Sequence, residues 1–137
     1  MPPALTPALA LDYVHELSAD VRAGVVLDAE GRLLAGPPWL AGPARALLAA
    51  AGEAAEAESV AADGVVCAAR WGSHAAVAVC GRFALPGLVR RDLRVALAAV
   101  AGESARDDPL RPSAPADAAV EAAADAARAE VRRRSGV

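Results

Sequence analysis

The sequence predicts an α+β fold, in which one five-stranded antiparallel sheet carries helices on both faces. The chain has 137 residues, enough for one modest hydrophobic core. Large apolar residues are concentrated in residues 1–102. There, helical periodicity alternates with short apolar runs in the order helix, two strands, helix, three strands, helix. We therefore expect a domain over residues 1–102, a linker over 103–114 and a further helix over 115–137.

The first predicted element is an amphipathic helix that runs from Pro7 to about residue 19. Thr6 is a typical N-cap, and proline is favoured at the first helical position. Apolar residues then recur at helical spacing, at Leu9, Tyr13, Val14 and Leu17.

A β-hairpin is predicted next, in LDAEGRLLAG. Val25, Val26 and Leu27 are consecutive apolar residues, as expected of a strand that is covered on both faces. Gly31 can take a positive φ and so supports a short bulged turn before the second strand.

The second helix is predicted in ARALLAAAGEAAEA, after a loop formed by GPPWLAGP. Leu47 and Leu48 are its only large residues. A helix so rich in alanine either lies very close to its neighbour or forms a contact surface with another subunit. Replacing both leucines by glutamate would give a folded monomer in the second case and an unfolded protein in the first.

Three short strands and a helix complete the predicted core. The strands are ESVAAD, DGVVCAARW and HAAVAVCGR, the last two joined by a turn at Gly72 and Ser73. The helix begins at Pro86, keeps an apolar stripe at helical spacing and ends at Gly102.

Residues 115–137 predict an additional helix rich in alanine and arginine. Its acidic residues come early and its arginines late, the order that the helix dipole favours. Because it has almost no large apolar residues, we expect it to be solvated or to dock on a partner.

This order of elements resembles the roadblock family, the dynein light-chain roadblock type of domain, across about residues 5–102. LDYVHELSADVRAGVVLDAEGRLLAG is similar to the family's first helix and hairpin, and PGLVRRDLRVALAAVAG to its last helix. The resemblance implies a roadblock/profilin-like sandwich and a non-enzymatic platform. It implies a homodimer, or a pair with a related roadblock-type chain, and a small Ras-like GTPase as partner, as is common for bacterial members.

The resemblance also implies a dimer seam along the third strand and the second helix. Carried onto this chain, the seam residues are Leu47, Leu48, Ala51, Glu58, Ser59, Val60, Ala61 and Ala62. The GPPWLAGP segment and the charged last helix depart from the family pattern, and both bear on how a partner would be oriented.

Two aromatic residues and three arginines are the predicted partner contacts. Trp39 and Phe83 lie in predicted loops, and aromatic side chains are favoured anchors at interfaces. Arg90, Arg91 and Arg94 offer bidentate recognition of an acidic partner, although a solvated polar face also explains them. Likewise, each aromatic residue could instead cover an edge of the core.

Catalysis and metal binding are not expected. The chain contains no lysine, which excludes Schiff-base and P-loop chemistry. Its two histidines, His15 and His74, and two cysteines, Cys67 and Cys80, are too scattered for a metal site. The cysteines fall on one face of adjacent strands, where they form either a redox switch or part of the core, and the core interpretation is favoured. No cofactor is expected.

Charge and hydropathy limit the partners further. A net charge of −3 makes nucleic acid an unexpected partner. There is no basic leader and no apolar run of the roughly 18 residues that a membrane span needs, so we expect a cytoplasmic protein. The predicted function is a dimeric scaffold or regulator of a small GTPase. The alternative is a profilin-like or PAS-like sensor domain, which a deep apolar cavity would favour.

Overall fold

The computed structural model describes residues 5–18, 20–105 and 111–135. Its elements are α1 (Pro7–Leu17), β1 (Val21–Asp28), β2 (Leu33–Ala35), α2 (Pro38–Ala50), β3 (Glu56–Ala61), β4 (Gly64–Trp71), β5 (His74–Cys80), α3 (Pro86–Val100) and α4 (Ala118–Arg134). The predicted α+β class and the order of elements are confirmed.

The five strands form one antiparallel sheet in the order β2-β1-β5-β4-β3. The two hairpins meet where β1 pairs with β5, so β2 and β3 are the edge strands. Along β4 and β5, alternate residues face opposite sides, and both sides are buried. This explains why these strands contain consecutive apolar residues.

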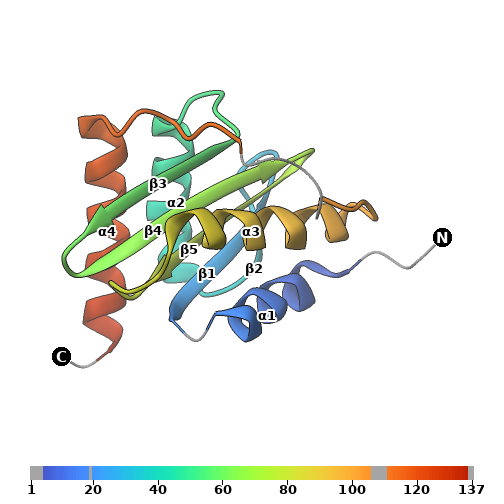
Figure 1. Cartoon of the computed structure of the whole chain (residues 1–137), viewed down its shortest axis with the longest axis horizontal. Helices are drawn as coiled ribbons and strands as arrows, with labels where there is room; N and C mark the ends of the chain where they lie inside the picture. Colours follow the sequence, from blue (N-terminus) through green and yellow to red (C-terminus); the bar gives the residue numbers. More distant parts are fainter. Residues whose placement is uncertain (1–4, 19, 106–110, 136–137) are drawn as a thin grey trace.

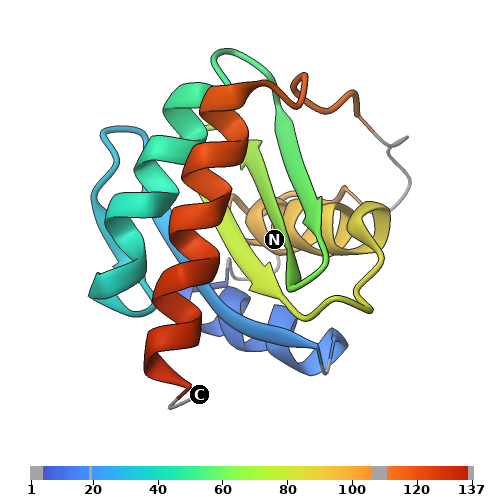
Figure 2. The same ribbon diagram turned by 90° about the vertical axis from the view of Figure 1, so that its left-hand side faces the viewer.

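Two helices cover each face of the sheet. Figure 1 shows α3 and α1 on one face, and Figure 2 shows α4 beside α2 on the other. The first layer contains Leu11, Val14, Leu93 and Leu97, which pack on the strand residues facing them. The second layer packs α2 and α4 on the opposite side chains of the same strands.

The predicted start of α1 and the first hairpin follow from local chemistry. The Thr6 hydroxyl accepts a hydrogen bond from Leu9 N at 3.2 Å, which caps the helix. In the hairpin, Asp28 Oδ1 accepts from Glu30 N and Arg32 N at 2.9 and 2.8 Å. These backbone hydrogen bonds lower the pKa of Asp28, and Gly31 takes a φ of 82°.

The prediction of a loop at GPPWLAGP is wrong, because α2 already begins at Pro38. Proline suits the first turn of a helix, and Leu40 and Ala41 are buried there. Pro43 lies within the helix, where it removes one backbone donor, and burial of the first turn offsets this loss. The helix ends at Ala50, earlier than predicted, because Gly52 follows with a φ of 63°. As a result β3 begins at Glu56.

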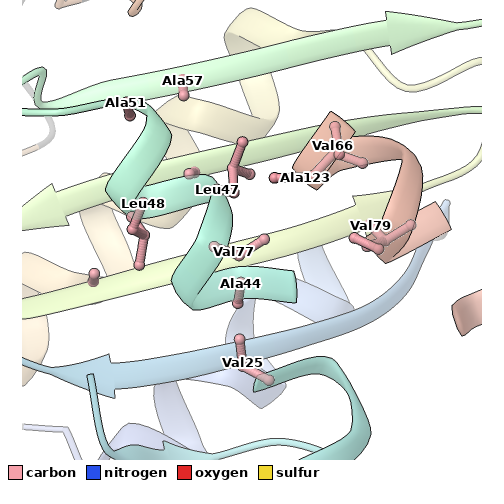
Figure 3. Close-up of a cluster of buried hydrophobic side chains, with 14 of the residues drawn as sticks. Val25, Ala44, Leu47, Leu48, Ala51, Ala57, Val66, Val77, Val79 and Ala123 are labelled. Carbon is pink, nitrogen blue, oxygen red and sulfur yellow. The ribbon is translucent and has the colours of Figure 1, made fainter. Parts of the chain in front are cut away.

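The core extends beyond residue 102, contrary to the boundary suggested by the distribution of large residues. The helix that we expected to be solvated or bound to a partner packs on its own domain. Val120, Ala123, Ala124 and Ala127 of α4 are buried against α2 and the sheet. Figure 3 shows Ala123 pointing into the cluster that contains Leu47, Val66 and Val79.

Part of the predicted linker, residues 106–110, lies outside the described residues. Beyond it the chain returns to the sheet, because Ala114 N donates to Glu56 O at 2.8 Å and Ser113 forms a parallel bridge with Glu56. This contact places the start of the last segment at the outer edge of β3 and leads it onto the face occupied by α2.

Candidate interaction surface

An apolar groove opens between the end of α1 and the start of α3. It measures about 350 Å³. In the described part of the chain, seven large apolar side chains are exposed, and four of them line this groove, namely Leu17, Phe83, Leu85 and Leu88. Exposed apolar residues scattered singly are ordinary, whereas a cluster marks an interaction site. We call this groove, with these four residues in its lining, the Phe83 groove.

Local structure explains why the Phe83 groove is open to solvent. Leu85 is the N-cap of α3 and Leu88 lies in its first turn, ahead of the buried residues that begin at Val89. Phe83 is 78% exposed, and the Arg82 guanidinium lies over its ring at 4.7 Å. The sequence predicted Phe83 as a contact, but it assigned both leucines to the buried stripe of the helix.

Asp20 and Asp92 lie in the same groove. Partial burial raises the pKa of Asp92, although the neighbouring Arg91 opposes the shift. The groove therefore combines an apolar floor with carboxylates in its lining.

Two of the three predicted arginine contacts are buried in an ion network. Arg90 Nε donates to Glu56 Oε1 at 2.8 Å, and Arg94 donates to Glu56 Oε2 at 2.9 Å. Arg90 also pairs with Glu58 and donates to the Arg111 carbonyl at 2.7 Å. The two side chains thus join α3 to β3 and to the segment after the linker. They are not at the surface, in contrast to Arg91, which is exposed.

Glu56 is the residue of this network that sequence reasoning missed. Its side chain is fully buried between the two arginines. A predicted helix through residue 57 concealed that Glu56 begins a strand. The pairing of an isolated glutamate with arginines more than thirty positions away left no signal in the sequence.

Trp39, the remaining predicted contact, is half-buried against the α2 and α4 layer. The Arg134 guanidinium of α4 lies over its ring at 4.7 Å. Trp39 therefore covers an edge of the core, which was the alternative interpretation of this residue.

The predicted dimer seam falls into two parts in the structure. Leu47, Leu48 and Ala51 of α2 are buried in the core that α2 forms with α4 and the sheet. Ser59 is also covered by α4, since its hydroxyl donates to Glu121 and accepts from Arg128 at 2.8 and 3.0 Å. These residues are inaccessible to a second chain while α4 is in place.

The outer edge of β3 is the part of the seam that stays open. Glu56 accepts a hydrogen bond at this edge, and the two-residue period of a strand directs the backbone of Glu58 and Val60 to the same side. No described hydrogen bond engages those backbone groups. Val60 is 61% exposed, and Ala61 and Ala62 are also outside the core. An exposed strand edge of this kind can pair with another strand.

The fold is found in solved structures. A crystal structure of a Roadblock/LC7 domain from Streptomyces avermitilis matches with a TM-score of 0.57 and 11% identity, over 73% of this chain and 94% of that chain. A second Roadblock/LC7 domain structure from the same organism matches with a TM-score of 0.53 and 17% identity, over 69% and 94%. The chain has the roadblock fold. No family model and no curated protein matches its sequence.

The cysteines of this roadblock fold are core residues in the described structure. Cys67 stands opposite Ala78 and Cys80 opposite Val65, and both thiols face the α1 and α3 layer. Burial raises the pKa of both thiols, that of Cys80 to about 12. At neutral pH both are therefore thiols, whereas nucleophilic and redox-active cysteines are thiolates.

His74 lies beside Ser73 without a free carboxylate to orient it among the described residues. Ser73 Oγ lies 3.4 Å from His74 Nδ1 at an exposed turn. Asp28 stands opposite His74 in the ladder, but its carboxylate is engaged by Glu30 N, Arg32 N and the Arg32 side chain. An acid that holds the hairpin turn is not available to orient a catalytic histidine.

Side-chain clusters and helix composition in the described part of the chain both bear on function. No group of three or more histidine, cysteine, aspartate or glutamate side chains is placed to hold a metal ion. None of the described helices combines the length and apolarity that crossing a membrane requires.

The apolar space enclosed between α1, α3 and the sheet is about 10 Å³, which is room for one water molecule. A deep apolar cavity would favour the sensor alternative, and this layer does not contain one.

Proposed function

We propose that this protein is a non-enzymatic regulator that binds a small Ras-like GTPase. The Phe83 groove carries the proposal, because more than half of the large apolar side chains exposed in the described structure gather there. Aromatic and leucine side chains in a cluster supply the buried centre of a protein interface. The roadblock fold supports the choice of partner, and a GTPase partner implies a cytoplasmic location.

We further propose that the protein pairs through the outer edge of β3, with a second copy or with a related roadblock-type chain. Glu58, Val60, Ala61 and Ala62 would form this seam. The open backbone groups of Glu58 and Val60 support strand pairing. Leu47, Leu48, Ala51 and Ser59 would enter the seam only if α4 left the domain.

The GTPase proposal is tested by affinity capture with the full chain as bait. Native lysate is supplemented with GDP or with a non-hydrolysable GTP analogue, and the bound proteins are identified by mass spectrometry. We expect one small GTPase to be enriched in only one of the two conditions. Absence of any GTPase from both would overturn the proposal.

Matched variants locate the contact on the molecule. Phe83→Asp combined with Leu88→Asp should abolish capture, because charges would replace the apolar centre of the groove. Leu9→Asp is the control, since Leu9 is an equally exposed leucine of α1 outside the groove. Equal loss in both variants would contradict the placement.

The seam is tested by the mass of the purified protein in solution. Val60→Pro removes a backbone donor at the proposed strand pair and should convert a dimer to a monomer. Light scattering after size-exclusion chromatography measures the mass. A wild-type protein that is monomeric at all concentrations would refute the proposed pairing.

A further inference from the structure

A second pocket opens beneath the last turns of α4, next to the Phe83 groove, with which it shares Asp20 and Phe83. It measures about 360 Å³. The start of β1, the end of β5 and the turn between β3 and β4 supply its other walls. Val79 and Val131 contribute apolar surface, while most of the polar lining is charged.

Positive charge is in excess in this pocket, although the chain as a whole carries −3. Four arginines line it, Arg22, Arg82, Arg128 and Arg132, against two aspartates, Asp20 and Asp63. The local balance is therefore +2, the difference between these four and two side chains. A concave positive site concentrates anions, because its walls focus the field.

Two of the four arginines are available to a ligand. Arg22 is 58% exposed, and its nearest carboxylate, that of Asp20, is 3.8 Å away. Arg82 forms no ion pair with any described residue and rests on the ring of Phe83. By contrast, Arg132 pairs with Asp63, and Arg128 is held inside the domain by Ser59, Gly64 and Asp125.

The pocket also contains two buried polar atoms without a hydrogen-bond partner among the described residues. They are Arg128 Nε, a donor, and Asp20 Oδ2, an acceptor. Arg128 Nε lies 3.7 Å from Asp63 Oδ1, too far for a hydrogen bond. Buried polar atoms in native proteins are almost always paired, so two at one pocket call for a molecule that both accepts and donates.

The end of α4 would by itself repel an anion, because the C-terminal end of a helix dipole is negative. Here Ser135 lessens the effect. Its N–H donates to the carbonyls of Arg132 and Val131, and its hydroxyl donates to that of Val131.

We propose that this pocket binds a small phosphate monoester whose carrier bears hydroxyl groups, that is, a sugar phosphate or a nucleoside monophosphate. Arg22 and Arg82 contact the phosphate, since guanidinium groups recognise phosphate oxygens in bidentate geometry. Asp20 accepts a hydrogen bond from a hydroxyl of the carrier. The apolar part of the carrier lies on Val79 and Val131.

Isothermal titration calorimetry on the full chain tests the proposal. The probes are ribose 5-phosphate, AMP, inorganic phosphate and ribose. We expect one of the two esters to bind at least tenfold more tightly than inorganic phosphate, and ribose not to bind. Comparing ribose 5-phosphate with AMP distinguishes the two sources of the ester. Binding of neither ester at millimolar concentration, or equal binding of inorganic phosphate, would overturn the proposal. Tighter binding of a phosphoserine peptide than of either ester would also overturn the proposal.

Three variants assign the contacts. Arg22→Gln and Arg82→Gln should each weaken ester binding at least fivefold. Arg91→Gln is the control, because Arg91 is exposed and lies outside the pocket.

Asp20→Asn should weaken the binding of ribose 5-phosphate but not that of inorganic phosphate if the carboxylate accepts a hydrogen bond from a hydroxyl. Tighter binding of both probes would show that Asp20 only repels the anion, and would overturn its role. Arg22, Arg82, Arg91 and Asp20 all lie outside the buried core. Arg22 and Arg82 line this pocket but not the Phe83 groove, so failure of ester binding leaves the GTPase proposal intact, whereas Asp20 lines both.

Discussion

The two faces of the sheet are covered by different kinds of helix layer. On the α1 and α3 face, leucine, valine and cysteine side chains fill the core, and the ends of the helices leave the Phe83 groove open. On the α2 and α4 face, alanine dominates the helix contacts, so the helices pack closely and few large apolar side chains are exposed. The comparison shows that the small side chains of α2 serve close packing within the chain. The sequence alone had equally allowed an interface with another subunit.

Each face is also joined to its helices by a buried charged residue, which is negative on one face and positive on the other. Glu56 joins the sheet to α3 through two arginines, whereas Arg128 joins α4 to the sheet through Ser59 and Gly64 and also pairs with Asp125 of its own helix. Such a pair contributes little compared with an apolar replacement, but breaking it leaves an uncompensated buried charge. On both faces, removing one partner of the buried pair should therefore lower the free energy of unfolding more than removing one partner of an exposed ion pair does.

The largest effect should come from Leu47→Glu, which places a charge in the α2 and α4 layer. Leu47 is 1% exposed, so we expect a loss of about 5 kcal/mol of unfolding free energy and an unfolded protein. Circular dichroism and thermal unfolding provide the measurement. Leu88→Glu on the other face should change stability by less than about 0.5 kcal/mol, since Leu88 is half exposed. A folded monomeric Leu47→Glu variant would show that α2 is an interface.

Glu56→Ala should cost about 4 kcal/mol, because Arg90 and Arg94 would lose the buried carboxylate between them. Urea unfolding of the variant measures the loss. Glu53→Ala, at an exposed position shortly before β3, is the matched control and should be close to neutral. Equal stability of the two variants would mean that water already satisfies the arginines.

Arg128→Met should cost about 2 kcal/mol and loosen α4 more than α3. The side chain is buried, and its loss leaves the Ser59 and Gly64 carbonyls without this donor. Hydrogen exchange should therefore accelerate in α4 and α2 while α1 and α3 stay protected. Arg133→Met, on the exposed side of α4, serves as the control. Uniform acceleration across all four helices would contradict a separable second layer.

The smallest effect at neutral pH concerns the thiols of the α1 and α3 face. Burial raises the pKa of Cys80 from 9.0 to about 12, so the unfolded chain loses this proton at lower pH than the folded protein does. The resulting stability is present below pH 9.0 and is lost as pH rises toward about 12, by roughly 1.4 kcal/mol per pH unit. Urea unfolding across this range should show a shallower decline for Cys80→Ala. Identical pH slopes would refute a buried thiol.

Local chemistry made the first three elements and the last core helix predictable from the sequence. Thr6 and Pro7 start α1, Asp28 and Gly31 shape the hairpin, and Pro86 starts α3. These features depend on residues within a few positions of one another. The end of α2 was equally local, since Gly52 takes a left-handed conformation, but the strong helix formers after it concealed the signal.

The candidate surfaces could be predicted only in part, because exposure depends on contacts between residues that are far apart in the sequence. Phe83 was identified because it is one of only four aromatic residues and lies in a predicted loop beside a helix. Leu85 and Leu88 continue the apolar stripe of α3, and periodicity cannot show that the first turn projects beyond the sheet. Arg90 and Arg94 have the sequence pattern of a polar face, yet their partner is Glu56 in a distant strand.

By itself, the sequence determined the α+β class, the order of the elements and the common face of Cys67 and Cys80, because these follow from periodicity and turn chemistry along the chain. Tertiary structure alone decided where α4 goes. A helix of alanine and arginine has too little apolar surface to select a site by hydrophobicity. Its position depends instead on the fit of small side chains against α2 and on the hydrogen bonds of Arg128 with groups more than sixty residues earlier in the chain. That packing decides whether the α2 face, and the pocket lined by Arg22 and Arg82, are exposed to solvent, to a ligand or to another subunit.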